Sequence, residues 1–264
     1  MYQDSVDGTI LAIDIGNTNI TCGIYQDDKL AWYSRFFSSP NRTADEYFSL
    51  LSPLLEKTMA DSVKIIAMAS VVPPLARVWQ HLFQKYFQAS IVEINALSPL
   101  GLGYKVPDPA SIGGDLVANA YAAWKKYNAN CIILDLGTAT KIQFVTSTGT
   151  FAGAAIAPGL KSSADKLFDS AALLTPIELV EPHVFLGTNT REALLSGIVH
   201  GHALMLEAYV QRIKLQYFEQ KEILTVLTGG IADLVKALVP SADLVDKTLT
   251  LDGIYLACRH LLAG

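Results

Sequence analysis

One short pattern, a run of β-forming residues that ends in Asp-x-Gly, occurs twice in this chain. The first copy is Asp14-Ile15-Gly16-Asn17-Thr18 and the second is Asp135-Leu136-Gly137-Thr138-Ala139-Thr140, 121 residues further on. Each copy is followed by two more strand-like runs, then by helical stretches and a further strand. A solenoid would need more and shorter repeats. The repeat therefore predicts a two-domain α/β protein made of two βββαβα units with a cleft between them.

Hydrophobic periodicity and turn residues give the expected elements. The predicted strands are 9–15, 20–25, 30–36, 63–72 and 91–94 in the first half, and 131–136, 142–146, 151–157 and 223–227 in the second. The predicted helices are 43–59, 75–87, 116–127, 160–173 and 189–218. Pro53 lies inside the first of these helices, so we expect a kink or a break there.

Composition narrows the class of protein. Only 17% of the 264 residues are charged and the net charge is −5, so neither a disordered chain nor a nucleic-acid partner is expected. The three cysteines, Cys22, Cys131 and Cys258, are far apart in apolar runs, which is typical of buried thiols in a reducing compartment. No signal peptide and no apolar run of membrane-spanning length is evident. We expect a cytoplasmic protein with no membrane partner.

The first Asp-x-Gly segment has the chemistry of a phosphate-binding loop. Gly16 lets the backbone turn sharply and approach a ligand closely, and Asn17 and Thr18 supply side-chain donors. Successive backbone N–H groups in such a turn form an anion-binding concavity. Asp14 cannot bind phosphate, but it can hold Mg²⁺ beside it. Taken alone, the segment is equally compatible with an ordinary hairpin turn.

The second copy and a late Gly-Gly pair favour a nucleotide site. Two such loops, one per repeat, can grip one polyphosphate, and Gly229-Gly230 leaves room for a flat group against the backbone. This arrangement resembles the actin, Hsp70 and sugar-kinase superfamily, with its two ribonuclease H-like domains. The residues expected to bind ATP and its phosphates are Asp14, Ile15, Gly16, Asn17, Thr18, Asn19, Ile20, Thr21, Thr138, Gly229 and Gly230.

Within that superfamily, nearly the whole chain is similar to type III pantothenate kinases. The stretches that carry the resemblance are Asp14–Thr18, Ser70–Pro73, Ile112–Asp115, Ala118–Ala120, Asp135–Thr140, Gly153–Gly159, Gly187–Thr190 and Thr228–Gly230. The resemblance implies ATP-dependent phosphorylation of the primary hydroxyl of pantothenate to 4′-phosphopantothenate, the first step of coenzyme A biosynthesis. It also implies ATP with Mg²⁺, a monovalent cation (potassium or ammonium) at Asp135, and a homodimer with the acceptor site near the interface. The expected domains are 1–117 and 118–264.

Asp115 is the expected catalytic base. It follows a Gly-Gly turn at the start of a predicted helix, and in the resembled family the matching Asp takes the proton from the pantothenate hydroxyl. A helix N-cap is the structural alternative. The other residues expected to bind the substrate are Tyr104, Gly113, Gly114, Leu116 and Thr190. Tyr104 fills its role only if two residues are inserted before Asp115, because an ungapped match places Val106 there. Thr190 can equally be a helix N-cap.

Three residues depart from the family pattern near this pocket. Leu116 replaces an Arg, Lys141 replaces a Thr, and Gln143 replaces an Asp. Leucine cannot pair with a carboxylate as arginine does. Two alternatives follow: a regulatory or nucleotide-binding paralogue with weakened catalysis, or a kinase for a different small hydroxyl compound. The histidines show no metal-ligand pattern and are interpreted as structural.

Overall fold

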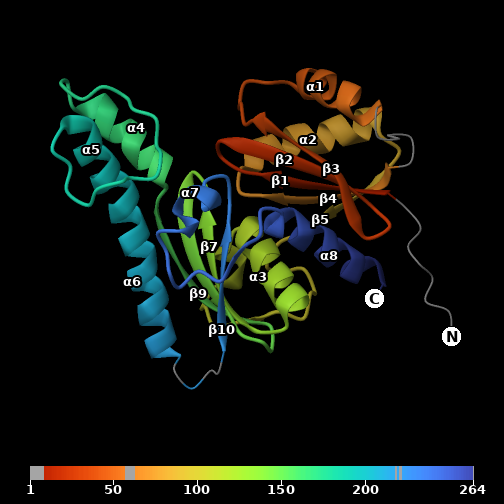
Figure 1. Ribbon diagram of the computed structural model, residues 1–264. Coiled ribbons are helices and arrows are strands. Elements are labelled where there is room, and N and C mark those ends of the chain that lie inside the picture. The colour runs from red at the N-terminus through yellow and green to blue at the C-terminus, as the bar shows by residue number, and fades with distance from the viewer. Residues whose placement is uncertain (1–8, 57–62, 218, 220–221, 264) are drawn as a thin grey trace. The chain divides into compact units, whose positions relative to one another are not determined.

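The computed structural model describes residues 9–56, 63–217, 219 and 222–263 (Figure 1). The chain divides into two compact units. Unit 1 is formed by Met1–Leu102, Pro107–Ala122 and Leu249–Gly264, and unit 2 by Gly103–Val106 and Ala123–Thr248.

Unit 1 contains a five-stranded sheet in the order β3-β2-β1-β4-β5. Its strands are β1 (Thr9–Ile15), β2 (Asn19–Gln26), β3 (Lys29–Phe37), β4 (Val63–Ser70) and β5 (Ser90–Glu93). The first three form the predicted antiparallel meander, while β4 runs parallel to β1 and β5 parallel to β4. The carboxyl ends of β1 and β4 therefore meet at one edge of the sheet.

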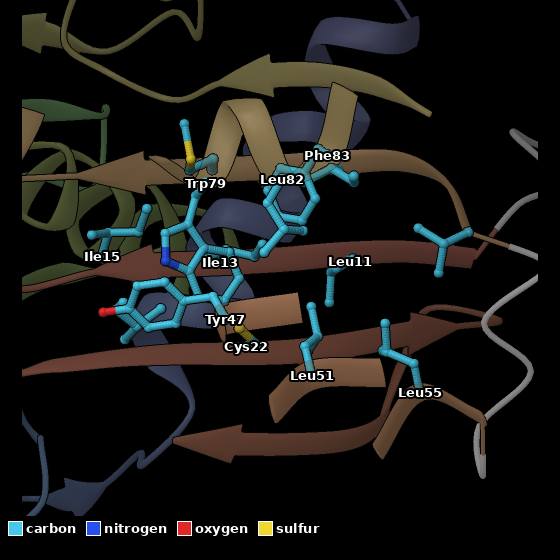
Figure 2. Close-up of a cluster of buried hydrophobic side chains, with 14 of the residues drawn as sticks. Leu11, Ile13, Ile15, Cys22, Tyr47, Leu51, Leu55, Trp79, Leu82 and Phe83 are labelled. Carbon is cyan, nitrogen blue, oxygen red and sulfur yellow. The ribbon is translucent and has the colours of Figure 1, made fainter. Parts of the chain in front are cut away.

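Helices α1 (Ala44–Glu56) and α2 (Pro73–Tyr86) cover one face of this sheet (Figure 1). Alternate β1 residues (Leu11, Ile13 and Ile15) point into the core between the sheet and these two helices (Figure 2). The largest buried side chains of this core are Tyr47, Trp79 and Phe83. The apolar stripes of both helices supply this core, as their periodicity predicts. Pro53 does not break α1, which continues to Glu56. A proline removes one backbone hydrogen bond, and packing on the sheet maintains the helix around it.

The opposite face of the unit 1 sheet is covered by α8 (Leu249–Ala263), and the first part of α3 (Gly114–Tyr127) packs on α8. The two helices touch closely at Gly253, where an added Cβ would lie 2.0 Å from the carbonyl oxygen of Ala118. Thr250 Oγ1 donates a hydrogen bond of 2.8 Å to Oδ1 of the fully buried Asn119. Helix α8 thus covers the face of the sheet that the α1–α2 core leaves uncovered.

Unit 2 contains a six-stranded sheet in the order β11-β10-β7-β8-β9-β6. Its strands are β6 (Gly103–Tyr104), β7 (Asn130–Leu136), β8 (Ala139–Val145), β9 (Thr150–Pro158), β10 (Ile223–Thr228) and β11 (Leu244–Val245). Its helices are α4 (Leu160–Ser170), α5 (Thr190–Leu195), a π-helical segment Ser196–His200, α6 (Gly201–Gln216) and α7 (Ala232–Lys236). One face of this sheet packs on the π-helical segment through Val199 and on α6 through Ala203, Leu206 and Val210.

The two sheets repeat one topology. In each, a meander of three strands is extended by two parallel strands next to its first strand, as β3-β2-β1-β4-β5 and β9-β8-β7-β10-β11. The predicted duplicated α/β fold is confirmed. The division at 117/118 differs from the observed units, because unit 1 takes α3 as far as Ala122 and also α8. Helix α8 belongs there because it packs on β1, β2 and β4.

The helical segment Thr190–Gln216 is long and apolar enough to cross a membrane by length and composition alone. The expectation that no segment reaches that length is therefore wrong. Leu206 and Val210 of this segment are fully buried against the sheet, as is usual for a core helix of a globular domain. The segment is therefore only weak support for a membrane span.

Candidate functional site

The first phosphate-loop candidate is a three-residue turn between β1 and β2, and the end of β3 fixes its backbone. Gly16 N–H donates to the carbonyl of Asn19 at 3.0 Å. Ser38 N–H donates to the carbonyl of Thr18 at 2.9 Å, and Ser38 Oγ donates to the carbonyl of Gly16 at 2.5 Å. Asn17 and Thr18 are exposed at the tip. The turn thus presents polar groups to solvent from a defined backbone.

The neighbouring residues of this loop differ in what they can offer a ligand. Asp14 is half-buried and lies opposite Thr21 on β2, so both side chains are on one face of the sheet. Ile15 and Ile20 are fully buried in the core. Their side chains cannot reach a phosphate, and only their main-chain groups are available for the predicted role.

The Gly113-Gly114 turn brings α3 close to the same edge of the unit 1 sheet. A Cβ on Gly114 would lie 2.8 Å from the carbonyl oxygen of Ile94, and one on Gly113 would lie 3.0 Å from a methyl group of Val71. Val71 N–H in turn donates to the carbonyl of Ile15, at the end of β1, at 3.0 Å. At Gly114 an added Cβ would meet a main-chain atom, so this glycine allows α3 to begin beside the carboxyl ends of β1 and β4.

Asp115 lies in the first turn of α3, not at its N-cap, because the helix begins at Gly114. Its side chain is 8% exposed, and Oδ1 accepts the N–H of Leu116 at 2.8 Å. The N-cap alternative is therefore wrong, although a carboxylate in the first turn still favours the helix dipole. The Leu116 side chain is 7% exposed and apolar. It brings no polar group to the position where the resembled family has an arginine.

The second loop candidate joins β7 to β8 through Gly137 and Thr138. Gly137 N–H donates to the carbonyl of Ala139 at 3.2 Å. The carbonyl of Thr138 accepts the N–H of Gly159 at 3.0 Å and the hydroxyl of Ser162 at 2.9 Å. A Cβ on Gly159 would lie 2.3 Å from the carbonyl oxygen of Gly137, so glycine is required there. The exposed Thr138 side chain is left facing solvent.

The Gly229-Gly230 pair follows β10, which runs parallel to β7 and ends at the same edge. Gly229 has a φ of +94°, and a Cβ there would lie 2.5 Å from the carbonyl oxygen of Leu136. The Gly-Gly turn therefore packs against the end of β7, next to the second loop. In unit 2 the structure brings Thr138, Asp135 and Gly229 together, as it brings Asp14 and Asp115 together at one edge in unit 1.

Asp135 is engaged by Lys141. The Lys141 Nζ lies 2.6 Å from Asp135 Oδ2, and the two side chains are 18% and 10% exposed. They face each other directly in the β7–β8 pairing. The ion pair stands at the position where the sequence predicts a monovalent cation.

Three buried polar side chains in unit 2, those of Tyr104, Gln143 and Thr225, have atoms without a hydrogen-bond partner in the described part of the chain. The Tyr104 hydroxyl and both amide atoms of Gln143 make no hydrogen bond within the described part of the chain. Burial raises the pKa of Tyr104, so its hydroxyl stays protonated and can donate. Unpaired buried polar atoms are costly, which makes them candidates for ligand contact. Val106, the alternative to Tyr104, has no hydroxyl to offer.

Thr190 is the first residue of α5 and is exposed. Asn189 is the N-cap instead, and its Oδ1 accepts the N–H of Glu192 at 3.0 Å. The N-cap alternative for Thr190 is therefore wrong.

The cysteines are free and buried, as predicted. Burial raises the pKa of Cys131 to about 12 and that of Cys258 to about 11, so both stay as inert thiols. Burial also lowers the pKa of His202, whose Nε2 lies 2.9 Å from the Thr140 hydroxyl. Across residues 9–56, 63–217, 219 and 222–263, no group of three or more His, Cys, Asp or Glu side chains is arranged to hold a metal.

Sequence reasoning missed the residues that fix the loops. Ser38 and Ser162 make their hydrogen bonds across gaps of 22 and 24 residues, and no local pattern marks such contacts. Lys141 departs from the family pattern by its residue type alone, whereas its pairing with Asp135 depends on the register of β7 and β8.

The duplicated α/β fold is the fold of the actin, Hsp70 and sugar-kinase class. Solved structures with this fold include a ROK family glucokinase from Streptomyces griseus (12% identity, TM-score 0.52, covering 96% of this chain and all of that one). Another is a putative Baf family transcriptional activator from Campylobacter jejuni (17% identity, TM-score 0.59, covering 94% of this chain and 97% of that one).

Within this class, the family model of type III pantothenate kinases matches residues 10–212. The type III pantothenate kinase of Roseiflexus castenholzii is 41% identical over 94% of this chain and 97% of its own length. That of Agathobacter rectalis is 35% identical over 95% and 96%. The chain belongs to the type III pantothenate kinase family.

Proposed function

We propose that this protein transfers the γ-phosphoryl group of ATP to the primary hydroxyl of pantothenate, forming 4′-phosphopantothenate for coenzyme A biosynthesis. The observation that carries this is the place of Asp115: a nearly buried carboxylate beside the carboxyl ends of β1 and β4, next to the Gly16–Thr18 loop. Membership of the family supports pantothenate as the acceptor.

The two loops suit the phosphates of ATP. Glycines at Gly16 and Gly137 let the backbone approach closely, and both turns are held by hydrogen bonds before any ligand binds. Asp14 would hold Mg²⁺ through oxygen, and Gly229-Gly230 would lie against the adenosine. Bound Mg²⁺-ATP supplies the phosphoryl group and neutralises part of its charge.

Asp115 would accept the proton of the pantothenate hydroxyl as that oxygen attacks phosphorus. Phosphoryl transfer depends mainly on positioning and charge stabilisation, so one oriented base is sufficient. The Tyr104 hydroxyl, which is protonated and has no hydrogen-bond partner among the described residues, would donate a hydrogen bond to the substrate. Main-chain groups of Gly113, Gly114 and Leu116 would complete its site.

The setting of the reaction is also part of the proposal. Buried free thiols fit a reducing cytoplasm. A homodimer, with Thr190 of one copy near the acceptor site of the other, is compatible with the exposed Leu204 and Leu215 on α6. The monovalent cation at Asp135 stays a prediction, and the residues present there fit it poorly because the Lys141 ammonium already contacts that carboxylate.

An ADP-release assay with and without pantothenate tests the function. We expect release that depends on pantothenate, and a loss of about a hundredfold or more in kcat for Asp115→Asn, because the amide cannot accept the proton. Asp169→Asn, at an exposed site on α4, is the control and should keep wild-type activity. Full activity in Asp115→Asn would refute the assigned base. Nucleotide binding without turnover would favour the regulatory alternative that Leu116 and Gln143 suggest.

A further inference from the structure

The ion pair between Lys141 and Asp135 is built into the unit 2 sheet. The two residues are direct neighbours across β7 and β8, and Thr228 is the neighbour of Asp135 on β10. All three side chains therefore lie on one face of the sheet. The Nζ–Oδ2 distance is 2.6 Å, and both side chains are largely buried. The lysine is thus held by the strand pairing beside the Gly137–Thr138 loop.

The first repeat shows that this lysine is not a requirement of the fold. There the residue across from Asp14 is Thr21, which carries no charge. The turn between the strands has three residues after β1, from Gly16 to Thr18, and two after β7, Gly137 and Thr138. In the second repeat the residue across from the strand-end aspartate is Lys141, which is charged.

The charge of Asp135 is already neutralised by Lys141, so binding of a second cation to this carboxylate is unfavourable. A carboxylate that is 10% exposed is costly unless a positive charge pairs with it. The ammonium of Lys141 provides that charge at hydrogen-bonding distance. A potassium ion on the same carboxylate would lie next to this ammonium and be repelled by it. The residues around Asp135 therefore do not fit the monovalent cation that family membership implies.

We propose that Lys141 is a built-in monovalent cation: its ammonium neutralises Asp135 beside the phosphate loop, so this kinase works without added potassium or ammonium. Lys141 is a positioning residue, since it acts through Asp135 and not on the phosphate. It keeps a net negative charge away from the loop where the ATP phosphates would bind. The activity part of this inference rests on the proposed function.

The test compares potassium, sodium and choline chlorides at equal ionic strength, so that screening is the same. For the wild type we expect turnover to change by less than about twofold among the three salts, because no ion binds at the site. For Lys141→Gln we expect turnover to fall by about tenfold in choline, because the Asp135 carboxylate then has lost the ammonium that neutralises it. We expect turnover to recover in potassium, because a potassium ion from solution can bind that carboxylate.

Thermal unfolding of the protein without ATP gives a second readout. Potassium should raise the Tm of Lys141→Gln above its value in choline, since an ion that binds only the folded state stabilises it. The wild-type Tm should not change. Lys126→Gln is the matched control, because Lys126 also pairs with a largely buried carboxylate, that of Asp246 at 2.5 Å. It should lose stability without gaining any preference for potassium.

The outcomes separate the inference from the function. A wild type that needs potassium for turnover, or that melts higher in potassium than in choline, overturns the inference. So does a folded Lys141→Gln that is indifferent to potassium. If no salt supports pantothenate-dependent ADP release, the proposed function fails, and the melting curves still decide the inference. If Lys141→Gln does not fold, Lys141→Arg replaces it, and that variant must stay indifferent to potassium.

Discussion

At the scale of single residues, the hydroxyl groups of Tyr104 and Tyr47 differ in their hydrogen bonding. Its ring packs near Phe151, with centroids 6.2 Å apart, while its hydroxyl is buried without a hydrogen bond in the described part of the chain. Tyr47 is the contrast: its hydroxyl accepts the N–H of Ser39 at 2.8 Å and donates to a main-chain carbonyl. The second hydroxyl stabilises the fold, and we propose that the first one contacts the substrate.

Tyr104→Phe should therefore separate binding from stability. We expect the KM for pantothenate to rise by about tenfold, the loss of one hydrogen bond, with no fall in the free energy of unfolding. Tyr47→Phe should instead lower that free energy by about 1 kcal/mol and leave the KM unchanged. Steady-state kinetics and urea unfolding measure both. A destabilised Tyr104→Phe with an unchanged KM would show that the hydroxyl is structural.

At the scale of elements, the contact between α3 and α8 has the tightest fit around a glycine. An added Cβ at Gly253 would lie 2.0 Å from the carbonyl oxygen of Ala118, a main-chain atom of a packed helix. Neither helix can move away without disturbing the Asn119–Thr250 hydrogen bond between them. Because α3 also carries Asp115 in its first turn, this crossing positions the proposed base.

Gly253→Ala should destabilise the protein by about 1–3 kcal/mol, the usual cost of forcing an extra methyl group into a packed core. Gly201→Ala is the control: it is also a helical glycine, but an added Cβ there meets no atom within 4 Å. That variant should be neutral or more stable by about 0.5–1 kcal/mol. Chemical unfolding of both decides. Equal stability of the two variants would mean that α8 adjusts freely.

Some elements of this fold can be predicted from local sequence signals, and others depend on distant contacts. The strands β1 and β7 were predictable because β-branched runs ending in Asp-x-Gly are strong local signals. Helix α8 was not predicted, and its assignment to unit 1 depends on contacts with strands more than 170 residues earlier in the chain, as in β1 and β4. The contact of Lys141 with Asp135 could not be predicted for a similar reason, since it depends on strand register rather than on residue type.

At the scale of the whole molecule, two leucines on one side of α6 lie outside the core of unit 2. Leu204 and Leu215 are 54% and 66% exposed, eleven residues apart and therefore on one side of the helix. The residues that pack on the sheet, such as Leu206 and Val210, are on the other side. A second copy of the chain is the occupant that we propose for this face.

Leu204→Glu should therefore convert a dimer to a monomer, because an interface excludes an unpaired charge. Light scattering after size exclusion should give twice the 28.6 kDa chain mass for the wild type and the single chain mass for the variant. Lys166→Gln makes the same change in net charge on α4 and should remain dimeric. A wild type that is already monomeric would refute the dimer.

The chain order of α8 also has a consequence for how the protein is made. A ribosome delivers residues from the first to the last, and unit 1 needs α8, which spans Leu249–Ala263. Unit 2 takes only residues before Leu249, so all of its strands emerge earlier than the last helix of unit 1. During synthesis the face of the β1–β5 sheet on which α8 packs therefore stays uncovered until α8 is made. This face should therefore stay accessible to chaperones until residues 249–263 have been made.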